Sequence, residues 1–186
     1  MKDVFELEPH TRISPEDSYV IAYPYILAHF QSLNNFTVRD FVCVAHIVYG
    51  WMPTILHLNP GEPINLRRGG ELLTQARRDG NLADTDIEQL VGLVNNSLVG
   101  VSKLLHFTAP NAFAIWDSKI YSFIFEEQPY NYRVNRIFAY CEYMSRLQHI
   151  KERSGFAAFH ASVNAKLGYE VTPLRAIELI MFLNAP

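Results

Sequence analysis

The sequence of 186 residues has only two cysteines and no apolar run as long as a membrane span. Cys43 and Cys141 lie in helical patterns, which is typical of reduced thiols in a cytoplasmic protein, and their spacing gives no metal site. A transmembrane helix needs about 20 consecutive apolar residues. The first ten residues, MKDVFELEPH, lack the basic and apolar blocks of a signal peptide. We therefore expect a cytoplasmic protein without a membrane partner.

The motifs of common metal and nucleotide sites are also missing. None of the seven histidines occurs in an H-x-x-x-H or H-E-x-x-H pattern, the spacings that place two ligands on one helix face. No glycine-rich phosphate loop follows a strand-like segment, which argues against the common nucleotide-binding folds. We predict neither a metal nor another cofactor.

Strict alternation of apolar and polar residues, the signature of a half-buried strand, is scarce. Helical patterns are abundant instead: Thr37 and Asp40 open a helix with apolar residues at i, i+3, i+4 and i+7. Thr85 begins a capping box that precedes another apolar stripe. The sequence predicts an all-α, multi-helical single domain over residues 1–186, with about eight to nine helices and with residues 1–13 as an N-terminal extension.

Proline and glycine predict where these helices break. Pro24 should bend or break its helix, because proline lacks a backbone N–H. Gly100 should interrupt the helix opened at Thr85 by adopting a positive φ, and a second helix should resume at Ser102. A helix-hairpin-helix-like element is thus predicted near residues 85–107. A long amphipathic helix is predicted over about residues 132–151.

The chain has no surplus of positive charge, with 16 Lys and Arg against 19 Asp and Glu and a net charge of −3. Residues 1–17 carry that negative charge, so the remainder is neutral overall and contains basic clusters in residues 64–80 and 128–153. Such clusters are either solvated helix faces or contacts for a phosphate backbone. The charge pattern is compatible with DNA as a partner but does not require it.

One lysine and one aspartate stand out in the apolar segment 99–123. An amine near apolar surface and a helix N-terminus has a lowered pKa and is more nucleophilic. Alternatively, Lys103 extends its ammonium group to solvent from the edge of the core. Asp117 is a helix N-cap under either interpretation. A capping carboxylate at a cleft can also stabilise a developing cation, so the cap does not exclude catalysis.

The segments GVSK at residues 100–103 and AIWDSKI at residues 114–120 resemble the core of the helix-hairpin-helix DNA glycosylases. The likeness is closest to a divergent 8-oxoguanine DNA glycosylase-like branch, in which similar segments precede a tyrosine-rich helix and a C-terminal P-x-x-x-E-x-x-x-F. Residues 132–143 supply the tyrosines here. Pro173, Glu178 and Phe182 supply the last pattern, with one extra residue between Pro and Glu. The resemblance spans residues 85–182.

This resemblance implies excision of damaged, oxidised bases from DNA. In that family a lysine attacks C1′ of the nucleotide, displaces the base and forms a Schiff base, while an aspartate stabilises the cationic centre or assists the lysine. Lys103 and Asp117 would take these two roles. The flipped base would occupy a pocket lined by Phe107 or Trp116. The resemblance also implies DNA contacts from Gly100, Val101, Ser102 and Lys119.

Two other functions stay open. The chain could be a non-catalytic helical domain on the same scaffold, which binds either nucleic acid or, as a defence-related adaptor, another protein. It could also be an all-helical interaction domain whose likeness to the glycosylases is coincidental. The sequence does not indicate the oligomeric state or the lesion.

Overall fold

The computed structural model describes residues 2–186 except Pro53, Pro60 and Glu62, and the side chains of residues 63–65 are left aside. Within the described residues all regular structure is helical, apart from one isolated antiparallel bridge between Leu58 and Val94. The all-α prediction is therefore confirmed. The α-helices are α1 (Val4–Leu7), α2 (Ser18–Ser32), α3 (Val38–Trp51), α4 (Pro63–Asp79), α5 (Asp84–Leu93), α6 (Leu98–Thr108), α7 (Ser118–Phe125), α8 (Asn131–Val134), α9 (Ile137–Lys151), α10 (Phe156–Leu167) and α11 (Pro173–Leu183).

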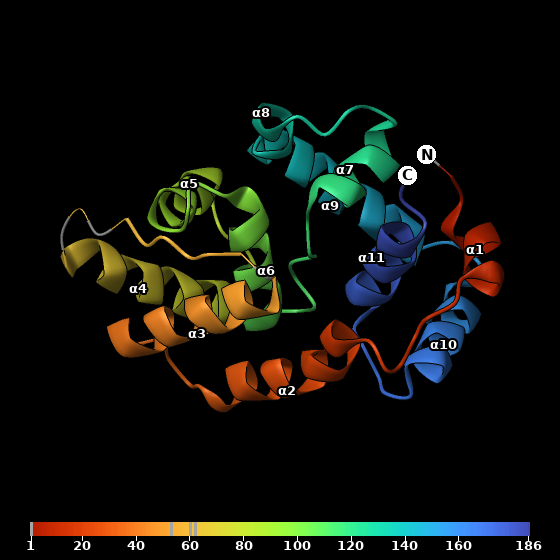
Figure 1. The fold of residues 1–186 in the computed structure, drawn as a ribbon, viewed down its shortest axis with the longest axis horizontal. Helices are drawn as coiled ribbons and strands as arrows, with labels where there is room; N and C mark the ends of the chain where they lie inside the picture. The colour runs from red at the N-terminus through yellow and green to blue at the C-terminus, as the bar shows by residue number, and fades with distance from the viewer. Residues whose placement is uncertain (1, 53, 60, 62) are drawn as a thin grey trace.

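Helix α6 lies at the centre of the molecule, between two groups of helices (Figure 1). It contacts α2, α3, α4 and α5 on one side, while α11 contacts α1, α7, α9 and α10 on the other. Most of α6 is buried, which agrees with its nearly continuous apolar sequence. No helix in the described part of the chain is long and apolar enough to cross a membrane.

Pro24 does not break its helix, contrary to the prediction. Helix α2 runs through it from Ser18 to Ser32. A proline removes the hydrogen bond to the carbonyl four residues earlier, which here belongs to Val20. The hydroxyl of Tyr169 donates to that carbonyl oxygen at 2.8 Å. A side chain distant in the sequence therefore satisfies the acceptor that Pro24 leaves open.

The helical hairpin near residues 85–107 is present as α5 and α6, but two predictions about it are wrong. Helix α5 begins at Asp84 with Ala83 as its N-cap and no side-chain cap, so Thr85 does not form a capping box. The prediction for Gly100 is wrong as well. The turn uses Asn95 and Asn96, whose φ values are +54° and +49°, and α6 already begins at Leu98. Gly100 lies inside that helix. A Cβ there would come within 2.1 Å of the Tyr49 hydroxyl oxygen. The glycine is therefore required by the close approach of a ring from α3, not by its φ.

The predicted helix over residues 132–151 is divided into α8 and α9. Asn135 lies between them, and its Oδ1 accepts a hydrogen bond from the Leu98 backbone N–H at 2.9 Å. The Val134 carbonyl accepts from the Trp116 indole N–H at 2.8 Å. These two bonds hold α8 against the start of α6 and against the residue that precedes Asp117.

The N-terminal segment is packed onto the domain. Val4 is buried, and α1 contacts α11. Asp3 forms an ion pair with Arg153 at 2.8 Å, and Ser162 donates a hydrogen bond to the Glu8 carboxylate at 2.7 Å. The described residues of the predicted extension therefore contribute to the helical core instead of projecting from it.

Candidate functional site

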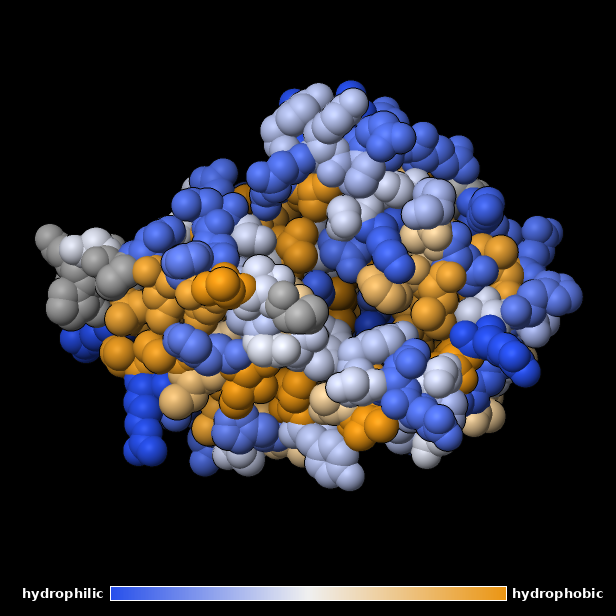
Figure 2. Space-filling model, in the orientation of Figure 1, coloured by the Kyte–Doolittle hydropathy of each residue, from blue (hydrophilic) through white to orange (hydrophobic). Residues whose placement is uncertain are grey.

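A cavity of about 840 Å³ lies where α2, α3, α6 and α11 meet. In the space-filling view it coincides with a hollow near the centre of the visible face (Figure 2). Among the described residues, the lining includes five charged residues and three aromatic ones: Asp17, Lys103, Asp117, Arg175, Glu178, Tyr19, Trp51 and Phe182. The lysine and aspartate singled out in the sequence therefore open into one cavity.

Lys103 lies in the second turn of α6, because that helix begins at Leu98 and not at Ser102. Among the described residues, none forms a hydrogen bond with its amine, and no carboxylate oxygen lies within 4.0 Å of the Lys103 nitrogen. Burial lowers the pKa of Lys103, and Asp117 and Glu178 oppose this shift in part. The expected lowering is thus present, but it comes from desolvation and not from a helix N-terminus.

Asp117 is the N-cap of α7, and its Oδ1 accepts from the Ile120 backbone N–H at 2.9 Å. Trp116, which precedes Asp117, is hydrogen-bonded to Ser102, which precedes Lys103. The Trp116 backbone N–H donates to Ser102 Oγ at 3.1 Å. Ser102 is completely buried. This bond sets the position of the aspartate relative to the lysine, which spacing along the sequence could not do.

Arg175 and Glu178 form a second charged pair at the cavity, one turn apart on α11. Their side chains are almost completely buried and form an ion pair. The Arg175 guanidinium also lies 4.8 Å from the centre of the Tyr23 ring. Burial raises the pKa of Glu178 to about 7, although Arg175 opposes the shift. The other Glu178 oxygen, Oε1, has no hydrogen bond to a described residue.

Sequence reasoning gave Glu178 no role beyond its place in the C-terminal pattern, and it did not select Arg175. A signal was present, because an arginine and a glutamate at i and i+3 interrupt the otherwise apolar segment PLRAIELIMFL. Charged residues so placed need a partner or a cavity. The same argument drew attention to Lys103 and Asp117.

Phe107 and Trp116, the predicted base-pocket residues, are fully buried and do not line the cavity. Phe107 packs edge-on against Trp51, with ring centres 5.3 Å apart. Trp116 packs against Tyr143 on the other side of the core. The aromatic lining comes instead from Tyr19 of α2, Trp51 of α3 and Phe182 of α11, and of these only Phe182 lies in the part of the chain that carried the resemblance.

Three of the predicted DNA contacts are also buried: Gly100, Val101 and Ser102. The Gly100 backbone N–H donates to Ser97 Oγ at 3.2 Å, and that of Val101 donates to the Ser97 carbonyl at 3.1 Å. These amides are therefore not free to bind a phosphate, which corrects that part of the prediction. Lys119 is exposed, and its Nζ lies 4.4 Å from the centre of the Phe182 ring at the cavity.

The basic cluster of residues 64–80 is largely neutralised within the protein. Arg67 pairs with Glu71, Arg68 with Asp86 and Arg78 with Asp79. Arg77 donates to backbone carbonyls, including that of Phe30 at 2.9 Å. These arginines thus stabilise the helices to which they belong, and the pattern does not favour a binding site for a phosphate backbone.

Comparison with known proteins adds no relative. A scan against models of protein families, a search of curated proteins and a search of solved structures each found no match.

Proposed function

We propose that the protein is a DNA glycosylase with lyase activity, in which Lys103 is the nucleophile and Asp117 its electrostatic partner. The observation that carries this proposal is that both side chains line one cavity, while the amine is partly desolvated and makes no ion pair within 4.0 Å of a described residue. A lysine that only extended its charge to solvent would need no such cavity.

The size and the lining of the cavity support this proposal. Its volume of about 840 Å³ is typical of small-molecule sites. Tyr19 and Trp51 offer ring faces against which a flipped base can stack. Arg175 and Glu178 add a hydrogen-bond donor and an acceptor for polar atoms of the base or sugar.

The proposed reaction begins with the neutral Lys103 amine. Its nitrogen forms a bond to C1′ while the bond from C1′ to the base breaks, and the base leaves with the electron pair and takes up a proton. A proton then passes from the nitrogen to O4′ while the bond between C1′ and O4′ breaks and the nitrogen lone pair forms the C1′=N bond, which opens the sugar ring to a protonated Schiff base with a free 4′-hydroxyl group. Asp117 stabilises the positive charge that develops at C1′. A lowered lysine pKa favours the first step, because only the free amine is nucleophilic.

Borohydride trapping tests the proposal directly. The wild-type protein should form a covalent adduct with a duplex that contains 8-oxoguanine or an abasic site, and peptide mapping should place it on Lys103. Lys103→Gln should form none. Lys151→Gln is the matched control, because Lys151 ends α9 and does not line the cavity; it should react like the wild type.

Two results would overturn the catalytic assignment: an adduct that survives Lys103→Gln, or no adduct between the wild type and abasic DNA. If DNA binds without an adduct and its affinity falls steeply with salt, the protein is instead a non-catalytic nucleic-acid-binding domain. This is the alternative left open by the sequence.

A further inference from the structure

A cluster of exposed aromatic and cationic side chains surrounds α8, outside the cavity. Tyr130, Tyr132 and Phe138 are 55%, 61% and 78% exposed, which is unusual for such large side chains. Arg133 and Arg136 lie between Tyr132 and Phe138 in the sequence. We call these five residues the α8 surface.

The two tyrosine rings of this surface are nearly parallel, with an interplanar angle of 7° and centres 5.9 Å apart. The Arg133 guanidinium lies 5.4 Å from the centre of the Tyr130 ring, and Arg136 lies 5.8 Å from that of Tyr132. The two rings and the two guanidinium groups beside them thus form one aromatic and cationic platform at the surface. Such a platform can accept the flat face of an unpaired base.

The charge of the surface also suits a nucleic acid. Arg133 is paired with Glu127, at 2.6 Å. Arg136 is exposed and makes no ion pair with a described residue, so it is free to contact a phosphate. This contrasts with the arginines of residues 64–80, which are satisfied within the protein.

The position of the α8 surface connects it to the candidate site. The Val134 carbonyl binds the Trp116 indole, and Trp116 directly precedes Asp117. Asn135 binds the backbone of Leu98 at the start of the lysine-bearing helix. These bonds tie α8 to the two segments that carry Lys103 and Asp117, and our inference places on α8 the nucleotides that flank the one in the cavity.

We infer that the α8 surface binds unpaired nucleotides of the DNA strand that flank the nucleotide drawn into the cavity. This inference rests on the proposed function, because the strand is placed by the Lys103–Asp117 cavity. Tyrosine faces would stack on bases irrespective of sequence, and Arg136 would neutralise a phosphate.

Fluorescence anisotropy with a fluorescein-labelled oligothymidylate tests the inference. Tyr132→Ala should weaken binding about five- to tenfold, whereas Tyr132→Phe, which keeps the ring, should bind like the wild type. Arg136→Gln should weaken binding and reduce the slope of log affinity against log salt by about one. The matched controls are Tyr25→Ala and Arg39→Gln, which change an exposed tyrosine on α2 and an exposed arginine on α3, both outside the α8 surface.

The outcomes separate this inference from the proposed function. Equal affinities for the α8 variants and the wild type, or equal losses in the α8 variants and their controls, would overturn the role of the α8 surface. Lack of any binding to the oligothymidylate would do the same. Trapping of the wild-type protein at Lys103 with abasic DNA is a separate measurement, and it alone decides the excision chemistry.

Discussion

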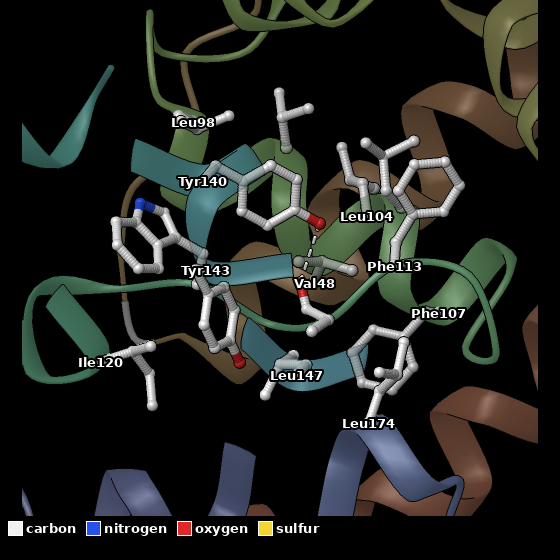
Figure 3. Packing of buried hydrophobic residues seen from close by; sticks show 14 of the residues in the cluster. Val48, Leu98, Leu104, Phe107, Phe113, Ile120, Tyr140, Tyr143, Leu147 and Leu174 are labelled. Carbon is white, nitrogen blue, oxygen red and sulfur yellow. Dashed lines mark hydrogen bonds between the residues drawn. The ribbon is translucent and has the colours of Figure 1, made fainter. Parts of the chain in front are cut away.

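The cavity lined by Lys103 and Glu178, called the polar cavity below, differs from the tyrosine cluster in how completely its polar groups are hydrogen-bonded. In the tyrosine cluster, formed by Trp116, Tyr140 and Tyr143, each polar atom has a backbone partner. Tyr140 donates to the Ala114 carbonyl at 3.1 Å, and Tyr143 donates to that of Ile115 at 3.0 Å. Figure 3 shows both rings among apolar side chains such as Leu104 and Ile120.

The polar cavity instead holds a desolvated amine without an ion pair to any described residue and a carboxyl whose pKa burial raises. Both shifts mean that the charged forms of Lys103 and Glu178 are disfavoured in the folded state. Hydrogen-bonded groups in a core stabilise the fold, whereas charged groups that are desolvated without full pairing lower the free energy of unfolding. This difference is what our proposal expects if the tyrosine cluster stabilises the fold and the cavity binds a ligand.

The largest expected effect comes from Asp117→Asn, which separates the two roles of that residue. Asparagine is as good an N-cap as aspartate, so the free energy of unfolding should change by less than about 0.5 kcal/mol. The carboxylate that would stabilise the positive charge at C1′ is lost, so the rate of adduct formation should fall about 10²-fold. A rate like that of the wild type would show that Asp117 acts only as the N-cap of α7 and has no role in the proposed reaction. Asp117→Ala should lose both the rate and about 1 kcal/mol of stability.

Glu178→Gln should make the protein more stable at high pH. The folded state raises the pKa of Glu178 from 4.5 to about 7, so the native protein holds a proton that the unfolded chain releases between these values. Wild-type stability should therefore fall as the pH rises from 4.5 to 7. The variant cannot titrate there and should be more stable by roughly 3 kcal/mol at pH 8, with no difference at pH 4.

Urea unfolding at several pH values measures this difference. Glu152→Gln, on a side chain that is 78% exposed, is the control and should match the wild type throughout. If Glu178→Gln instead destabilises the protein at pH 8, the ion pair with Arg175 outweighs the desolvation of the carboxylate. The cavity would then resemble the tyrosine cluster in stabilising the fold.

Gly100→Ala should destabilise the protein by about 1–3 kcal/mol, because the new methyl group collides with Tyr49. Gly92→Ala is a matched control in α5, since a Cβ there meets nothing within 4 Å. That variant should gain up to about 1 kcal/mol from helix propensity. Thermal unfolding of both variants checks the expectation, and equal shifts would show that Gly100 is not a packing glycine.

The smallest effect is expected for Tyr143→Phe in the tyrosine cluster. It removes the donor to the Ile115 carbonyl, which should cost about 1 kcal/mol. Tyr132→Phe, at an exposed ring, should change the free energy of unfolding by less than about 0.5 kcal/mol. Denaturant unfolding of the pair compares them, and a neutral Tyr143→Phe would remove the contrast with the cavity.

Much of the secondary structure could be predicted, because its signals are local. Thr37 with Asp40 forms the expected capping box, and Asp117 and Thr172 cap their helices through side-chain oxygens. The errors at Pro24 and Gly100 have the same origin. Tyr169 completes the helix around Pro24, and Tyr49 requires Gly100, and neither partner is near in the sequence.

Lys103 and Asp117 could be identified from the sequence because a charge in an apolar segment must have a physical reason wherever the chain folds. Their meeting in one cavity could not be inferred, since it depends on the bond between Ser102 and Trp116 and on the packing of α11 against α7. The aromatic lining from Tyr19 and Trp51 and the buried Arg175–Glu178 pair likewise follow only from tertiary structure. Helices arise from neighbours along the chain, whereas a cavity is formed by residues that folding brings together.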